Sequence, residues 1–231
     1  MKDVTPFETA IGVQFSDKKL LTQAFIHRSY INENPKTGLE HNERLEFLGD
    51  AVLELVVTDF LHRTYPDQDE GDLTAYRAAL VNSHTIADAA RELSMNEYLL
   101  LSKGESKDTG KARHYILANT FEAVVGAIYL DQGYTAAAKF IADFLLPKMA
   151  DIVAKKLWRD AKSLIQEKAQ EYMSITPTYR VLGESGPDHD KQFSVGVFVG
   201  NEMLASAKGK SKQEAEQEAA RAGLEAKDWL D

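Results

Sequence analysis

Residues 117–130, LANTFEAVVGAIYL, form an almost wholly apolar run that has to lie inside a folded core. A helix that is apolar nearly all round is usually buried, yet Glu122 stands in the middle of this one as its only charged residue. Acidic side chains are almost never fully buried without a partner. Three states therefore remain open for Glu122: a buried protonated carboxyl, an ion pair with an arginine, or a bond to a metal ion.

A second apolar segment, residues 41–57 (HNERLEFLGDAVLELVV) of a helix predicted over 41–64, carries four acids. At about 100° per residue, Glu43, Glu46, Asp50 and Glu54 share one stripe roughly 80° wide. An ordinary amphipathic helix would turn such a stripe to water. Here apolar residues border the stripe on both sides, which favours burial and a need for partners. The metal-bound state of Glu122 is favoured, because both acidic segments need the same neutralisation.

Packing these two helices face to face would gather the oxygen atoms of Glu46, Asp50, Asn119 and Glu122. Hard cations such as Mg²⁺ or Mn²⁺ prefer oxygen donors. The chain has no cysteine, and its six histidines are scattered, so it offers no soft ligand set. Carboxylate-bound Mg²⁺ commonly serves phosphoryl chemistry. The residues alone therefore point to a divalent-metal phosphodiesterase or phosphatase, without naming its substrate.

The chain has 231 residues, of which 44% are hydrophobic, and a formal net charge of −9. This size allows one large domain or two modest ones. Helical patterns fill residues 1–155, whereas residues 160–229 show the pattern of a helix, three strands and a helix. We therefore expect an all-α domain followed by a small α+β domain of αβββα order, joined within the polar segment KKLWRD.

The predicted elements follow from periodicity and capping signals. In the first domain, helices are predicted at 17–31, 41–64, 72–80, 83–93, 112–132 and 134–154, with a polar loop at 99–111. In the second domain, a helix at 162–173 and strands at 178–182, 193–199 and 203–207 precede a last helix that ends at Leu224. Ser211 and Glu214 have the spacing of a capping box at the start of that helix.

Other signals concern the cellular setting. No run reaches the roughly 18 apolar residues that a membrane span requires, and the N-terminal residues lack the apolar core of a secretory signal. The absence of cysteine fits a reducing compartment. We therefore expect a cytoplasmic protein without membrane contact. The acidic balance argues weakly against nucleic acid as a partner, but the local features below outweigh it.

Several long motifs resemble those of the ribonuclease III family. In the first domain these are LLTQAFIHRSYINE (20–33), HNERLEFLGD (41–50), DEGDLTAYRAALV (69–81) and ILANTFEAVVGAIYLD (116–131). The second domain resembles a double-stranded-RNA-binding domain at DAKSLIQEKAQ (160–170), PTYRV (177–181), GPDHDKQF (186–193) and GKSKQEAEQEAA (209–220). These motifs cover nearly the whole chain in the order of bacterial ribonuclease III.

The resemblance implies an endoribonuclease that cuts both strands of double-stranded RNA and leaves 5′-phosphate and 3′-hydroxyl ends. Mg²⁺ would be the cofactor, Mn²⁺ would substitute for it, and no organic cofactor is expected. The substrates implied are ribosomal, messenger and small RNAs. The family works as a homodimer whose two nuclease domains form one catalytic valley, in which each site hydrolyses one strand.

The resemblance also assigns residues of the nuclease domain. Glu46, Asn119 and Glu122 occupy its metal-ligand positions, whereas Asp50 and Glu122 occupy those of the catalytic carboxylates that orient metal and water. Two further acids belong to the valley, Glu43 and Glu70, the latter in the site of the partner subunit. Phe47 stands where the family has an aromatic dimer contact, and plain core packing is the alternative.

Asn119 departs from the family, which has aspartate at this metal-ligand position. Asparagine keeps a carbonyl oxygen but removes a full negative charge. Asn119 is either a tolerated variant that binds metal directly or through water, which we favour because the other acids are present, or a change that weakens metal binding. The second interpretation gives a double-stranded-RNA-binding protein whose cleavage activity is impaired. A helical hydrolase of small phosphates is a third function, from chemistry alone.

Lys208, Lys210 and Lys212 cluster around Ser211 at the start of the last helix. A helix N-terminus offers free N–H groups and a positive dipole end to a phosphate. A solvated charge run is the alternative, and the resemblance favours RNA binding. The family has a second lysine where this chain has Gln213, so Lys208 is a candidate substitute.

The other two RNA contacts come from the resemblance alone. Gln166 and Glu167 on the first helix of the domain would meet one minor groove, and His189 in the loop between strands would enter the next. Such recognition reads A-form shape and 2′-hydroxyls rather than sequence.

Overall fold

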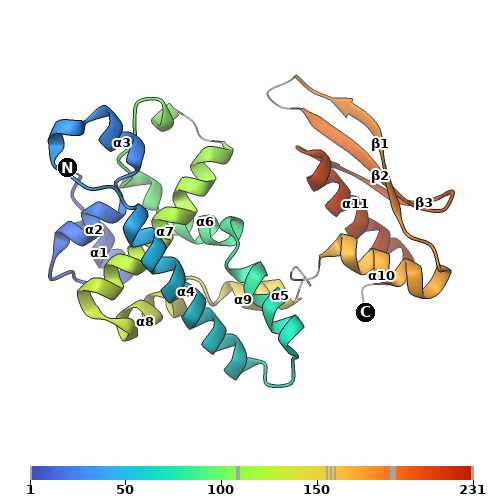
Figure 1. The fold of residues 1–231 in the computed structure, drawn as a ribbon, viewed down its shortest axis with the longest axis horizontal. Coiled ribbons are helices and arrows are strands. Elements are labelled where there is room, and N and C mark those ends of the chain that lie inside the picture. The colour runs from blue at the N-terminus through green and yellow to red at the C-terminus, as the bar shows by residue number, and fades with distance from the viewer. Residues whose placement is uncertain are drawn as a thin grey trace. The chain divides into compact units, whose positions relative to one another are not determined.

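The computed structural model describes residues 2–107, 110–154, 156, 158, 160–187 and 191–229, and the chain divides into two compact units, residues 1–158 and 159–231 (Figure 1). The predicted domain bounds, 1–155 and 160–229, stay predictions, because residues 155, 157 and 159 lie outside the described part. None of the described helices is long and apolar enough to cross a lipid bilayer.

In the described part of the first unit, the regular secondary structure is helical, apart from one isolated bridge between Ile26 and Leu100. Its α-helices are α1 (Thr5–Ile11), α2 (Lys18–Ala24), α3 (Arg28–Glu33), α4 (Glu43–Thr64), α5 (Glu70–Leu80), α6 (Ser83–Glu92), α7 (Lys111–Gln132), α8 (Tyr134–Phe144) and α9 (Lys148–Ala154). Short 3₁₀ turns lie at Pro35–Thr37, Met95–Glu97 and Glu105–Lys107.

The two long helices α4 and α7 cross at the centre of this unit (Figure 1). Leu53 and Val57 on α4 and Phe121, Val124 and Ile128 on α7 have no exposed surface. Burying a side chain of this size stabilises the fold by about 1.5–3 kcal/mol. The apolar runs recognised in the sequence are therefore the core of the unit.

Two glycines let α4 and α7 approach closely. A Cβ atom on Gly49 would lie 1.8 Å from the carbonyl oxygen of Glu122, and one on Gly126 would lie 2.2 Å from that of Leu45. Both distances are far below van der Waals contact, so only glycine fits at either position. The backbones therefore touch, and the acidic stripe of α4 lies beside Glu122.

Two predicted helices are broken in the structure. The helix predicted at 17–31 is wrong at Phe25–His27, because Ile26 leaves the helix to pair with Leu100 and the His27 ring caps α3. The helix predicted at 134–154 is interrupted at residues 145–147. Pro147 has no amide hydrogen and cannot lie inside a helix without disrupting it.

Helix α1 was not predicted, although it has clear signals at both ends. A proline stands in its first turn, and Gly12 ends it in the left-handed region at φ 67°. The buried Glu8 accepts a hydrogen bond from the Phe15 amide and pairs with Lys18 at 2.9 Å. These contacts tie α1 to the segment that follows it.

The second unit consists of α10 (Ala161–Met173), β1 (Thr178–Ser185), β2 (Gln192–Val199), β3 (Glu202–Gly209) and α11 (Lys212–Lys227). The strands form an antiparallel sheet in the order β1-β2-β3, and both helices cover one of its faces (Figure 1). Its core consists of Ala161, Ile165, Val197, Ala219, Ala220 and Leu224. The predicted αβββα order is confirmed.

Side-chain caps begin both helices of this unit. Asp160 accepts a hydrogen bond from the Ser163 amide at 2.7 Å, and Ser211 accepts one from the Glu214 amide at 3.1 Å. The Glu214 carboxylate then accepts a bond from the amide of Lys210. In the predicted capping box the Glu214 carboxylate would accept from the amide of Ser211. In the structure it accepts from the amide of the preceding residue instead.

Candidate functional site

Glu122 lies on α7 where α4 comes closest, and its surroundings are anionic. Burial raises the pKa of the Glu122 carboxyl to about 8, with further contributions from the charges of Asp50, Glu46 and Glu54. Each of these causes acts in the same direction. Of the three states left open by the sequence, an ion pair with arginine is therefore wrong for Glu122 within the described residues.

Glu46 and Asn119 meet in the same place. Burial and the charge of Glu43 raise the pKa of Glu46, whereas a hydrogen bond from the Asn119 side chain lowers it. Asp50 also raises the pKa of Glu46. The four predicted residues Glu46, Asp50, Asn119 and Glu122 therefore lie together, and we call them the carboxylate cluster.

The two ends of the acidic stripe are neutralised, and its centre is not. Glu43 pairs with Arg28 at 3.4 Å, and Glu54 pairs with Arg77 at 3.1 Å. In the described parts of the chain, no ion pair reaches Glu46, Asp50 or Glu122. Repulsion is thus concentrated in the carboxylate cluster, where a cation would relieve it. The pairing of Glu54 with α5 was missed, because no sequence signal predicts which arginine a distant helix brings.

The donor set of the carboxylate cluster fits a hard, hydrated cation. All four side chains offer oxygen, which Mg²⁺ and Mn²⁺ prefer. Among the described residues, no three or more His, Asp or Glu side chains lie in a group that could hold a metal ion by themselves. The carboxylate cluster would therefore supply only part of the ligands of Mg²⁺, which usually keeps several waters and takes one or two carboxylates together with substrate phosphates.

The further acid Glu70 lies elsewhere in the unit. It begins α5 and lines a pocket of about 420 Å³ with Thr58, His62 and Arg77 among other residues. Glu70 is exposed and is not one of the groups that shift the pKa of Glu122. A single chain therefore does not bring Glu70 into the carboxylate cluster.

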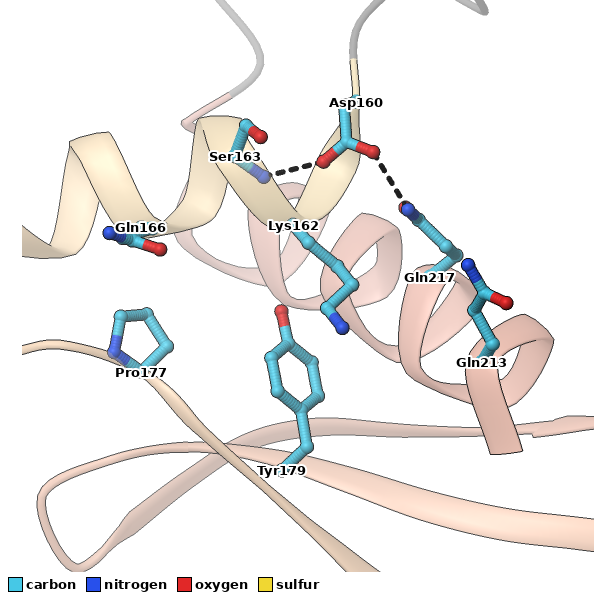
Figure 2. A pocket seen from close by; sticks show the side chains of 8 residues that line it. All are labelled: Asp160, Lys162, Ser163, Gln166, Pro177, Tyr179, Gln213 and Gln217. Carbon is cyan, nitrogen blue, oxygen red and sulfur yellow. Dashed lines mark hydrogen bonds between the residues drawn. The ribbon is translucent and has the colours of Figure 1, made fainter.

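In the second unit, Gln166 lines a pocket of about 350 Å³ between α10 and α11 (Figure 2). Asp160 accepts a hydrogen bond from Gln217 across it, at 2.8 Å. Figure 2 shows the Tyr179 hydroxyl pointing from β1 toward Lys162, and this buried hydroxyl has no hydrogen-bond partner within the described residues. Glu167 follows on the exposed side of α10.

The predicted lysine cluster is exposed at the start of α11. Lys208, Lys210 and Lys212 all face solvent, and the Lys212 ammonium lies 5.6 Å from the centre of the Phe193 ring. A Cβ atom on Gly209 would lie 2.5 Å from the Ala215 amide nitrogen. Glycine is therefore required where β3 meets α11, and this contact fixes the cluster at the helix N-terminus. His189 lies outside the described residues.

Comparison with known proteins accounts for both units. The protein-family model described as Ribonuclease-III-like matches residues 17–149, and the family model of the double-stranded RNA binding motif matches residues 161–227. The chain belongs to the ribonuclease III family. Ribonuclease 3 of Pelotomaculum thermopropionicum is 44% identical over 221 residues, covering 96% of this chain and 92% of the relative. Ribonuclease 3 of Bacillus licheniformis is 46% identical over 218 residues, covering 94% and 87%.

A solved structure supports the same assignment for the first unit. The nuclease domain of ribonuclease III from Campylobacter jejuni, studied for flexibility in its dimer-forming region, aligns with a TM-score of 0.57 and 37% identity. The match covers 63% of this chain and 99% of that chain. The predicted ribonuclease III fold, a helical nuclease domain before an αβββα RNA-binding domain, is confirmed. Members of this family generally use a divalent metal ion.

The exposure of Phe47 is relevant to dimer formation by the nuclease domain. This side chain is 81% exposed on α4, and Leu55 on the same helix is 58% exposed. The alternative of core packing within one chain is therefore wrong for Phe47. A ribonuclease III dimer contact stays a prediction for this residue.

Proposed function

We propose that this chain is an Mg²⁺-dependent endoribonuclease that hydrolyses both strands of double-stranded RNA to 5′-phosphate and 3′-hydroxyl ends. The observation that carries the proposal is the carboxylate cluster, in which Glu46, Asn119 and Glu122 are half-buried. The cluster lacks a cationic partner among the described residues and belongs to a ribonuclease III nuclease domain. Mn²⁺ would substitute for Mg²⁺, and no organic cofactor is needed.

Glu46 and Glu122 would hold the ion through their carboxylates, and Asn119 would add its carbonyl oxygen directly or through water. When bound, the ion would supply a Lewis acid that lowers the pKa of water and neutralises charge on the transferred phosphoryl group. Asp50 and Glu122 orient the attacking water by accepting its hydrogen bonds. The water releases one proton as its oxygen bonds to phosphorus, the bond between phosphorus and the 3′ oxygen breaks, and that oxygen takes up a proton to leave as the 3′-hydroxyl.

The second unit would hold the duplex. Lys208, Lys210 and Lys212 present three ammonium groups beside the N–H groups of α11, which suits a row of phosphates. The side chains of Gln166 and Glu167 are exposed on α10 and suit 2′-hydroxyls in a minor groove. His189, which lies outside the described residues, and the hydroxyl of Ser211 complete the proposed RNA contacts.

We further propose that the enzyme acts as a homodimer, with Phe47 in the contact and Glu43 and Glu70 as accessory acids of the shared valley. Ribosomal, messenger and small RNA precursors are the proposed substrates, and the cytoplasm is the proposed location. A second function, double-stranded-RNA binding with weak cleavage, is favoured by one observation. Asn119 gives the carboxylate cluster one negative charge fewer than an aspartate would.

A defined hairpin RNA tests these functions. The hairpin is incubated with the full chain, with and without Mg²⁺, and the product ends are mapped. Two-nucleotide 3′ overhangs with 5′-phosphates are expected only with Mg²⁺. Binding without cutting would favour the second function.

The hydrolase of small phosphates is tested separately by deleting residues 156–231. That function requires the remaining unit to hydrolyse a small phosphate ester as fast as the full chain does. The proposed function requires instead that the deletion weaken cleavage of duplex RNA.

A further inference from the structure

Helix α7 opens to solvent along one narrow strip. Between residues 116 and 128 every side chain is buried except those of Asn119 and Glu122, which are half-buried. One turn before Asn119, Tyr115 is 50% exposed. Seven residues separate Tyr115 from Glu122, which places them within about 20° of each other around the helix and about 10 Å apart along it. Tyr115, Asn119 and Glu122 therefore form one open strip.

The aromatic ring of Tyr115 is supported from behind. The His114 ring meets it edge to face at a centroid distance of 6.0 Å. His114 accepts a hydrogen bond from Arg91 at Nδ1, over 2.8 Å, and donates one to the backbone carbonyl of Ser83. Both partners belong to α6. These bonds hold the start of α7 against α6, and the ring contact packs one side of Tyr115 against His114.

On α7 between residues 115 and 128, a substrate at the carboxylate cluster can meet only the open strip, because the other side chains of this stretch are buried. Bases in an RNA duplex are paired and stacked, so the tyrosine ring cannot stack on them without opening the duplex. The A-form minor groove instead displays 2′-hydroxyls beside the phosphates. A phenol hydroxyl both donates and accepts hydrogen bonds, which suits either backbone oxygen.

We propose that the Tyr115 hydroxyl donates a hydrogen bond to a backbone oxygen of a nucleotide next to the scissile phosphate. Tyr115 is then a substrate-contacting residue that fixes the position of the strand over the carboxylate cluster. This inference rests on the proposed function, because it takes duplex RNA as the substrate.

The test compares Tyr115→Phe with wild type on a defined hairpin, with Tyr134→Phe as the matched control. Tyr134 begins α8 and is similarly exposed, at 41%. Loss of one such hydrogen bond is expected to raise KM roughly 3- to 10-fold. The Tyr134→Phe control is expected to leave KM unchanged. Removal of one hydroxyl leaves the ring packing intact, so equal melting temperatures are expected for all three proteins.

Single 2′-deoxy substitutions along the hairpin distinguish the two acceptor oxygens. If the acceptor is a 2′-hydroxyl, one substitution beside the cleavage site weakens wild type as much as Tyr115→Phe does, and adds nothing in the variant. If the acceptor is a phosphate, the substitutions act alike in both proteins while the KM defect of Tyr115→Phe persists. Either pattern supports the contact.

Two outcomes would overturn the inference. One is wild-type KM and kcat in Tyr115→Phe, and the other is a KM defect accompanied by a change of oligomeric mass, which would place Tyr115 at a chain contact. Failure of the proposed function is a different result, because in that case the wild-type protein itself leaves the hairpin uncut.

Discussion

Gly49 on α4 packs directly against the backbone of Glu122 on α7, where a Cβ atom would lie 1.8 Å from the Glu122 carbonyl oxygen. The proposed metal site needs the two helices to touch here, because its acids come from both. We therefore expect Gly49→Ala to push the helices apart, to destabilise the first unit by about 3 kcal/mol and to abolish RNA cleavage. Thermal unfolding and the hairpin assay measure both effects.

The control for this substitution is Gly104→Ala. A Cβ atom on Gly104 would have its nearest neighbour at 3.8 Å, which is ordinary contact. That variant should unfold and cleave like wild type. Wild-type stability in Gly49→Ala would show that the helices have room to spare, and the account of the close approach would then fail.

Asn119→Asp should strengthen metal binding by the carboxylate cluster. The substitution adds a negative charge beside Glu46 and replaces an amide that now donates a hydrogen bond to it. We expect half-saturation at a Mg²⁺ concentration several-fold lower, because a nearby opposite charge favours binding. The rise of the melting temperature with Mg²⁺ measures this without any RNA. Identical metal dependence of the two proteins would remove Asn119 from the ligand set.

Glu122→Gln should separate catalysis from RNA binding. If Glu122 has its proposed catalytic role, its loss is expected to lower kcat by at least about 100-fold, while the affinity for the hairpin stays unchanged because the second unit is intact. Without metal, the variant should also be more stable by about 1–3 kcal/mol, because a carboxyl with a pKa near 8 is costly to ionise where it lies. Unfolding in a chelator measures the gain. A less stable variant would contradict the strained, anionic character of the cluster.

Lys212→Ala should weaken binding to all double-stranded RNA sequences alike. A phosphate contact carries no sequence information, and its loss reduces the slope of log affinity against log salt by about one unit. Affinities for three unrelated duplexes over a range of salt concentrations measure both effects. Lys227→Ala is the control in the same helix, since Lys227 pairs with Glu202 at 2.8 Å. A loss confined to one duplex sequence would be inconsistent with phosphate binding.

Asp160 makes the second unit sensitive to acid. Burial alone would raise its pKa, but hydrogen bonds from the Ser163 amide and the Gln217 side chain lower it below the ordinary value of 3.8. A lowered native pKa gives stability that is present above pH 3.8 and is lost as the pH falls through the native value. Asp160→Ala should cost about 1 kcal/mol at neutral pH, and the deficit should shrink below pH 4. A deficit independent of pH would mean that the charge of Asp160 contributes nothing.

Local patterns predicted the elements of the fold well where the cause of the structure is local. The cap at Ser211 was read from a short local motif and lies where it was expected. The break between α2 and α3 has a distant cause, the pairing of Ile26 with Leu100. Helical periodicity contains no information about such a pairing, so one long helix was predicted there.

The residues of the candidate site also divide into those with a local signal in the sequence and those that depend on packing. Helical spacing alone placed Glu46 and Asp50 on one stripe, and the isolation of Glu122 in an apolar run marked it as unusual. The arginines that neutralise the ends of the stripe come from α3 and α5, and only the packed structure reveals them. Tyr115 was missed for a different reason. Its exposure on a mostly buried helix depends on what the neighbouring helices cover.

The open strip on α7 also limits what one chain can do by itself. A duplex carries its two backbones on opposite sides of each groove, and on the proposed function one open strip would meet one of them. Cutting the other backbone would then need the open strip of a second copy. The distance between the two strips in a dimer would set the offset between the two cuts.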